Sequence, residues 1–256
     1  MPTAEGFDGV FAALAQSDTI QRIWREAYGD EYPANVQPFG FITVSMLQRI
    51  AHEIKMEPGQ TLGDLACGSG GPGLWVARTT DVRLVGVDFS SVAIQQARQR
   101  AAAFGLSGKA DFLVSEVTAI PVPDAHLDAA MSVDSFQLFP DQPAALREIA
   151  RTLRLGARLV LSTWDAGYTR AQGTRHRSQY QAMLQETGFA LESYEAIPDW
   201  ERPQGAVYAG ILAAQASLTT ELGETVANKL IFEANEFPAR VADRRRVLIV
   251  ARKRAA

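Results

Sequence analysis

Cysteine and histidine are scarce in this sequence. Its 256 residues include one cysteine, Cys67, and three histidines, so the chain has no internal disulfide frame and no cysteine-based metal site. It contains no run of about eighteen apolar residues, as a membrane-spanning helix would require, and no signal-like start. We expect a soluble, cytoplasmic protein that binds no metal.

A large excess of charge of one sign is also missing. The formal net charge is −4, which gives no electrostatic basis for binding nucleic acid or an anionic membrane. A chain of this length can bury a large core as one unit, and we interpret residues 1–256 as a single domain that acts on a small molecule. The sequence does not fix the oligomeric state; a homodimer is compatible with it.

A glycine-rich stretch is what the sequence does offer. Residues 61–66 predict a short buried strand, residues 67–71 a turn, and Pro72 the first turn of a helix, where its missing N–H has no intrahelical partner to lose. Glycines at 68, 70, 71 and 73 allow a sharp turn and the close approach of a ligand. The unpaired N–H groups of the helix start then face that turn.

An acidic residue completes this unit. Residues 82–90 predict a second strand that carries Asp88 at its carboxyl end, twenty residues after Gly68. This spacing is typical of sites that hold an adenosine, with the acid on the ribose hydroxyls. Asp64, however, lies inside the first strand, where a pyrophosphate binder would carry an apolar residue. An unpaired buried carboxylate needs a cation or donors nearby, which favours S-adenosyl-L-methionine (SAM), with its sulfonium and ammonium groups, over a dinucleotide.

These residues resemble the class I SAM-dependent methyltransferases, whose first motif is D/E-x-G-x-G-x-G. Here the motif reads Asp64-Leu-Ala-Cys-Gly-Ser-Gly70, with Ala66 where the family most often has a glycine. Residues 154–158 are close to the family's L-R-P-G-G turn. The chain has no Asn-Pro-Pro-Tyr sequence, which argues against methylation of amide or base nitrogens.

The resemblance implies SAM as cofactor and a set of residues at the carboxyl ends of four strands. Glu116 and Val117 fit the pair that grips the adenine, with the carboxylate on the exocyclic amine and a backbone N–H on a ring nitrogen. The implied cofactor-binding residues are Asp64, Ala66, Cys67, Gly68, Gly70, Asp88, Phe89, Ser90, Glu116, Val117, Ser132 and Val133, together with Tyr32 from the N-terminal segment.

Strands alternate with helices over residues 61–163, which predicts an α/β fold, a three-layer Rossmann-like sandwich around a mostly parallel sheet. The resemblance implies seven strands, the last (246–251) antiparallel between strands five (157–163) and six (189–196). We expect residues 1–58 to form a helical lid, 60–165 the cofactor-binding core, and 166–256 the acceptor-side helices and last strands. Two helices are expected within 203–237, and the arginines at 244–246 are expected at a solvated strand end.

The acceptor is less constrained. Aromatic residues gather outside the core motifs and ligand pockets are mostly apolar, so we expect a small, largely apolar acceptor under a lid. Candidate acceptor-binding residues are Trp24, Tyr28, Phe39, Gln137, Trp164 and His176, and candidate bases are His176, Asp134 and Tyr28. A base is needed only when the nucleophile is a poorly acidic hydroxyl or an ammonium, and the sequence leaves that open.

The favoured function is SN2 transfer of the SAM methyl group to an O, C or N atom of such a metabolite, in specialised (natural-product) metabolism. Two alternatives stay open. The same fold with bound SAM can catalyse cyclisation or another non-transfer step, and a non-methylating nucleotide-binding α/β domain is the third hypothesis. Asp64 and the absence of a Tyr-x-x-x-Lys pair disfavour the third.

Overall fold

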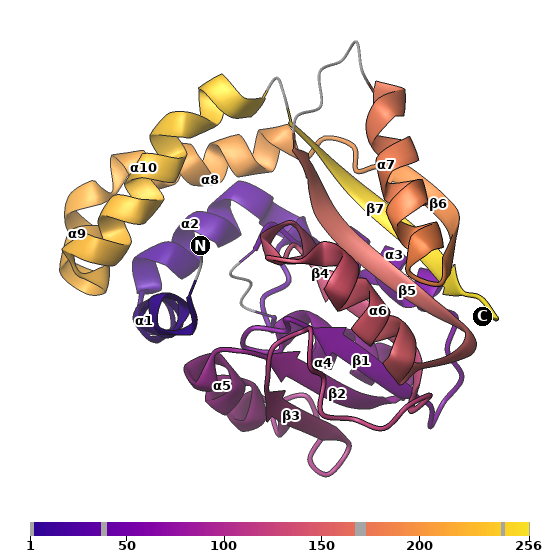
Figure 1. The fold of residues 1–256 in the computed structure, drawn as a ribbon. Helices are drawn as coiled ribbons and strands as arrows, with labels where there is room; N and C mark the ends of the chain where they lie inside the picture. Colours follow the sequence, from indigo (N-terminus) through magenta and orange to yellow (C-terminus); the bar gives the residue numbers. More distant parts are fainter. Residues whose placement is uncertain (1–2, 37–39, 167–172, 242–243, 256) are drawn as a thin grey trace.

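A mostly parallel sheet forms the middle layer of the molecule (Figure 1). The computed structural model describes residues 3–36, 40–166, 173–241 and 244–255, and within them the strand order is β3-β2-β1-β4-β5-β7-β6. The strands are β1 (Thr61–Leu65), β2 (Arg83–Asp88), β3 (Ala110–Val114), β4 (Leu127–Val133), β5 (Leu153–Ala166), β6 (Phe189–Ala196) and β7 (Arg244–Lys253). β7 runs antiparallel between β5 and β6. The predicted three-layer fold and the place of its last strand are confirmed.

Helices cover both faces of this sheet. The helices α3 (Val44–Ile54), α4 (Gly71–Thr80) and α5 (Ser91–Ala101) pack on one face, and α6 (Gln142–Thr152) and α7 (Gly173–Glu186) pack on the other (Figure 1). Alternate residues of each strand point to opposite faces of the sheet and pack in different cores. Leu62 belongs to the core under α3–α5, and Leu65 belongs to the core under α6 and α7. The period-two pattern of the strands therefore builds both cores.

Strand β5 begins earlier than predicted. Residues 154–158 were expected as a turn, but they lie within β5 because Leu127 pairs with Leu153 before the register shifts to the pair Ala129–Arg158. Gly156 has a φ of +79°, a conformation that glycine adopts without strain. The turn-like sequence thus encodes an irregularity inside the strand.

A separate group of helices lies beside the sheet (Figure 1). It contains α1 (Ala4–Leu14) and α2 (Asp18–Tyr28) from the N-terminal segment and α8 (Glu201–Ala213), α9 (Gln215–Leu222) and α10 (Glu224–Arg240) from the insertion between β6 and β7. These helices share one hydrophobic cluster. Two inserted helices were expected, but the insertion contains three: α9 lies between the two expected ones, and Gly223, with a φ of +76°, separates it from α10. None of the described helices is long and apolar enough to cross a membrane.

Candidate active site

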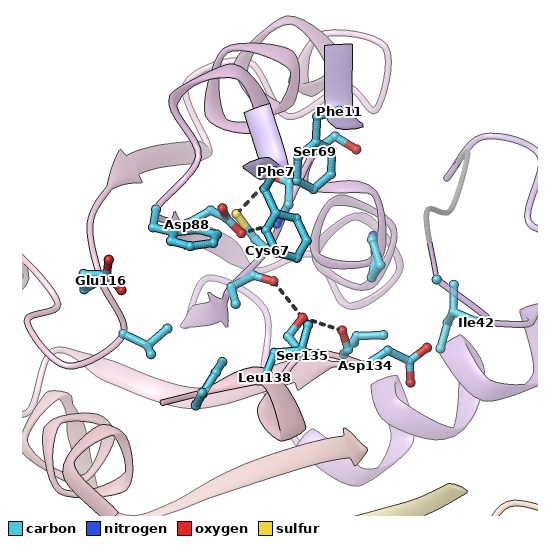
Figure 2. Close-up of a pocket in the computed structure, with 18 of the residues that line it drawn as sticks. Phe7, Phe11, Ile42, Cys67, Ser69, Asp88, Glu116, Asp134, Ser135 and Leu138 are labelled. Carbon is cyan, nitrogen blue, oxygen red and sulfur yellow. Dashed lines mark hydrogen bonds between the residues drawn. The ribbon is translucent and has the colours of Figure 1, made fainter. Parts of the chain in front are cut away.

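A cavity lies at the carboxyl edge of β1 to β4, where the parallel strands end together (Figure 2). It encloses about 220 Å³. Its walls come from the loops after these four strands, from α1 and from the segment before α3. The lining residues include Phe7, Phe11, Val36, Gly40, Ile42, Ala66, Cys67, Gly68, Ser69, Asp88, Phe89, Glu116, Val117, Val133, Asp134, Ser135, Leu138 and Phe139. Eight of the thirteen residues that the sequence predicts for the cofactor meet here.

The turn after β1 is folded as the glycine pattern predicts. Ala66, Gly68 and Gly70 have φ values of +56°, +53° and +76°. A Cβ atom on Gly70 would lie 2.9 Å from the Cβ of Ala97 on α5, and one on Gly68 would lie 3.0 Å from Cζ of Phe11 on α1. Glycine is therefore favoured at both positions by backbone conformation, and at Gly70 also by lack of space, whereas Ala66 adopts a left-handed conformation that is unfavourable for alanine.

Asp88 connects this turn to the end of β2. Its carboxylate accepts hydrogen bonds from the backbone N–H of Gly68 (2.8 Å) and of Ser90 (2.9 Å). The residue is 4% exposed, and burial raises the pKa of its carboxyl, while the two backbone donors act in the opposite direction. Asp88 thus fixes the turn and lines the cavity at the same time.

Asp64 lies behind the turn instead of lining the cavity. It is 1% exposed, it abuts Gly73 at the start of α4, and its Oδ2 accepts no hydrogen bond from the described residues. Burial, with a contribution from the nearby Asp88, raises the pKa of Asp64 to about 7, although a backbone hydrogen bond from Gly73 opposes the shift. A buried carboxylate without full compensation favours a cation in its surroundings.

Glu116 and Val117 lie side by side in the cavity wall, after β3. Val117 is buried, whereas Glu116 is exposed. Its carboxylate has no hydrogen-bond or ion-pair partner among the described residues. The pair therefore offers an uncommitted carboxylate beside a buried apolar residue, as an adenine-binding pair requires.

Other predicted cofactor residues lie outside the cavity lining. Ser132 is fully buried within β4, and Ser90 caps α5 by accepting from the N–H of Ala93 (3.1 Å). The Tyr32 hydroxyl donates to Oε1 of Gln21 (2.5 Å). These side chains, like Gly70 and Asp64, support the walls instead of forming them.

The helix α1 covers the turn; the sequence predicts it as part of a helical lid but does not identify the turn and α5 as its partners. The rings of Phe7 and Phe11 line the cavity (Figure 2), and the Phe7 ring centroid is 5.5 Å from that of Phe89. Asp8, between them in the sequence, accepts hydrogen bonds from the hydroxyl of Ser90 and from the N–H of Val92 (3.3 Å) at the start of α5. The sequence pattern shows an amphipathic helix but not the partner on which it lies.

Arg100 of α5 is a second feature that sequence reasoning missed. Its Nη1 donates to Oγ (2.9 Å) and to the carbonyl oxygen (3.2 Å) of Ser69 in the turn. Its Nη2 donates to the carbonyl oxygens of Asn35 (3.1 Å) and Val36. One guanidinium therefore ties the glycine turn to the segment that follows Tyr32.

The candidate acceptor residues lie in different places. Trp24, Tyr28 and Trp164 do not line the cavity; they pack around Phe41, with the Trp24 and Phe41 ring centroids 6.0 Å apart. Burial also raises the pKa of Tyr28, so its phenol is a poor base. Gln137 is held by the hydroxyl of Thr163 (2.8 Å). Phe39 and the side chain of His176 lie outside the described residues.

Asp134 lies in the cavity wall, but its carboxylate is already paired. Nη2 of Arg246 donates to Oδ1 (2.6 Å) and Oδ2 (2.7 Å). Arg246 is 3% exposed, and Arg245 pairs with Asp165 (3.3 Å). The expectation that these arginines lie at a solvated strand end was therefore wrong for 245 and 246, because Arg245 pairs with the buried Asp165 of β5 and Arg246 pairs with Asp134 after the end of β4.

Comparisons with known proteins agree with this geometry. A family model described as "Methyltransferase domain" matches residues 63–156. The 27-O-demethylrifamycin SV methyltransferase of Amycolatopsis mediterranei is 28% identical over 74% of this chain and 76% of its own length. Methyltransferase GfsG of Streptomyces halstedii is 26% identical, with 75% and 74% covered. The chain is a SAM-dependent methyltransferase.

Solved structures share the fold of this methyltransferase. A SAM-dependent methyltransferase from Thiobacillus denitrificans, in complex with S-adenosyl-L-homocysteine, superposes with a TM-score of 0.65 at 18% identity, covering 91% of this chain and 97% of that one. The (4+2)-cyclase SpnF superposes with a TM-score of 0.73 at 24% identity, covering 83% and 82%. The fold thus occurs both in a methyltransferase and in a cyclase.

The residues of the cavity fit SAM, the cofactor of this methyltransferase family. The turn leaves no Cβ in the way at Gly68, and Asp64, buried directly behind the turn with its Oδ2 unpartnered among the described residues, favours a positive charge nearby. Asp88 and Glu116 provide carboxylates at the ends of β2 and β3. When bound, SAM supplies an electrophilic methyl group on a sulfonium.

Proposed function

We propose that this methyltransferase transfers the methyl group to a small, largely apolar metabolite of natural-product type. One observation carries the proposal: the cavity joins the polar, acid-bearing strand ends to an apolar wall formed by side chains of α1, the segment before α3 and the loop after β4. Ile42, Leu138 and Phe139 represent that wall. An apolar wall with few polar anchors is what a small hydrophobic acceptor needs.

The names of relatives support the same acceptor class. Their printed names include a 27-O-demethylrifamycin SV methyltransferase and O-methyltransferases from Pyrenophora dematioidea and Aspergillus sclerotiorum. We assign the cofactor site to Asp88, Glu116 and the turn from Ala66 to Ser69, with Asp64 acting through the turn. The chain's own contribution to catalysis is placement of the two reactants and exclusion of water.

The experiment that tests this proposal follows the products. The protein is incubated with SAM and a panel of apolar phenols, enols, amines and macrolide alcohols, and S-adenosylhomocysteine and the acceptor mass are measured together by mass spectrometry. A gain of 14 Da on one acceptor with equimolar S-adenosylhomocysteine, as expected for replacement of H by CH₃, supports the proposal. An acceptor that rearranges at constant mass, with SAM unconsumed, would instead identify the cyclisation alternative raised by the structural similarity to SpnF.

A further inference from the structure

Arg246 reaches the cavity wall from the last strand of the sheet. It pairs with Trp164 across β5 and β7, its guanidinium carbon is 5.3 Å from the centroid of that ring, and the side chain is almost completely buried. Its Nη1 donates to the carbonyl oxygen of Phe41 (2.8 Å), and its Nη2 donates to both carboxylate oxygens of Asp134. One side chain therefore contacts two separate walls.

These walls enclose the same side of the cavity. Gly40 and Ile42 line it from the segment before α3, and Asp134 and Ser135 line it from the end of β4 (Figure 2). The walls also touch directly, because the N–H of Phe41 donates to Oδ2 of Asp134 (3.2 Å). Arg246 thus fastens a contact between segments that are far apart in the sequence.

Asp134 is held in an unfavourable backbone conformation at this point. Its φ is +54°, which is uncommon for residues other than glycine and persists only where the surroundings enforce it. The hydroxyl of Ser162 donates to Oδ1 (2.9 Å), so four contacts from three residues fix the carboxylate. A carboxylate fixed by this many contacts is typical of a side chain whose position determines the shape of a binding site.

The pair also sets the charge of the cavity. Three carboxylates line it, those of Asp88, Glu116 and Asp134, and the described lining contains no basic side chain. Only Asp134 has an arginine partner. Without Arg246, the end of β4 would present a bare carboxylate to whatever cation occupies the cavity, and in a poorly solvated site such a charge acts strongly.

We infer that Arg246 is a positioning residue, which locks Asp134 as a neutral ion pair and so sets the charge and shape of the cavity wall at the end of β4. The inference rests on the proposed cofactor site, since it concerns what that cavity presents to SAM. Lysine does not replace arginine here, because only the guanidinium fork reaches the carboxylate and a carbonyl together.

The test compares SAM with S-adenosylhomocysteine, which lacks the positive charge on sulfur. Both are titrated calorimetrically into wild-type protein, Arg246→Met and the double variant Asp134→Asn/Arg246→Met. We expect the ratio of the S-adenosylhomocysteine Kd to the SAM Kd to rise roughly fivefold or more in Arg246→Met, because the unpaired Asp134 attracts the sulfonium. The double variant, with no carboxylate, is expected to return the ratio to near the wild-type value.

Each other result has a defined meaning. Equal weakening of both ligands in folded Arg246→Met would overturn the inference, because it would show a packing role alone. Wild-type protein that binds neither compound would overturn the proposed function as well. If Arg246→Met fails to fold, Arg246→Lys decides: exchange of the Phe41 amide hydrogen should accelerate by about tenfold or more while the Kd ratio stays unchanged. Unchanged exchange in that variant would contradict the positioning role.

Discussion

Asp64 is a carboxylate that the fold buries without giving it a full set of partners. The folded-state pKa of about 7 lies above the ordinary value of 3.8. As pH rises from about 4 to 7, the unfolded chain therefore loses its proton first, and the free energy of unfolding falls. Above about pH 7, Asp64 is ionised in the folded state as well, and the free energy of unfolding does not fall further on account of this group. The residue is costly for stability at neutral pH, and we attribute its presence to cofactor binding.

The first prediction concerns Asp64→Asn without cofactor. Because the amide cannot ionise, we expect the variant to be more stable than wild type at pH 8, by on the order of 3 kcal/mol, and nearly equal to it at pH 4. Urea unfolding at both pH values measures this difference. For SAM binding the ionised carboxylate is favourable instead of costly. The SAM affinity of wild type should therefore increase from pH 6 to 8, and Asp64→Asn should lose the part of this increase that comes from ionisation of Asp64. Identical pH dependence of SAM affinity in the two proteins would contradict the assignment.

The turn after β1 allows a matched pair of substitutions. Ala66→Gly removes a left-handed strain of about 1 kcal/mol but makes the unfolded chain more flexible, so its net effect should lie between zero and about +1 kcal/mol of stability. Gly70→Ala should cost about 2 kcal/mol or more, because its Cβ would meet Ala97 at 2.9 Å in a conformation that alanine avoids. Thermal unfolding of both variants gives the comparison. A similar loss of stability in both variants would contradict the expectation that position 70 requires glycine and position 66 does not.

Among the elements, local ones were predictable and distant contacts were not. The β1–turn–α4–β2 unit follows from glycine spacing and strand periodicity within about thirty residues, and it is present as predicted. The bond between Asp8 and Ser90 joins residues 82 apart, and that between Asp134 and Arg246 joins residues 112 apart. Periodicity shows that a helix has an apolar face, but the partner of that face depends on the whole chain. For this reason the sequence predicts α1 as part of a lid but not its bond to α5, and the place of Arg246 in the site is seen only in the structure.

The helix α1 is predicted to move when its attachment through Asp8 is lost. Asp8→Ala removes a carboxylate from the start of α5, which should cost about 1 kcal/mol of stability. Amide exchange across residues 4–14 should become faster, and SAM should dissociate faster because Phe7 and Phe11 cover the turn. Glu5→Ala is the control, since Glu5 is an exposed acid on the same helix. Equal exchange rates in the two variants would mean that Asp8 does not hold the helix.

In the molecule as a whole, the carboxyl edge of the sheet faces a helical layer, made of α1 and α2 from the N-terminal segment and α8, α9 and α10 from the insertion before β7. The sequence places the cofactor residues on the sheet edge, where strand ends converge, and most of them line one cavity. It assigns the aromatic residues Trp24, Tyr28 and Trp164 to the acceptor, whereas in the structure Trp24 and Tyr28 are buried in the helical cluster and the half-buried Trp164 packs against Phe41 and Trp200. Their place in acceptor binding stays a prediction. The cavity of about 220 Å³ is small beside ordinary ligand pockets, so we expect the helical layer to shift when both reactants bind.

The measurement that tests the account most directly is calorimetric titration of SAM and S-adenosylhomocysteine into wild type, Asp88→Ala and Asp111→Ala. Asp88 lines the cavity, whereas Asp111 is an exposed acid on the edge strand β3. We predict that wild type and Asp111→Ala bind alike and that Asp88→Ala binds more weakly by about 2–4 kcal/mol, because the ribose hydroxyls lose a charged acceptor and the glycine turn loses its anchor. Folded wild-type protein that binds neither compound, or Asp88→Ala that binds as tightly as wild type, would contradict the account.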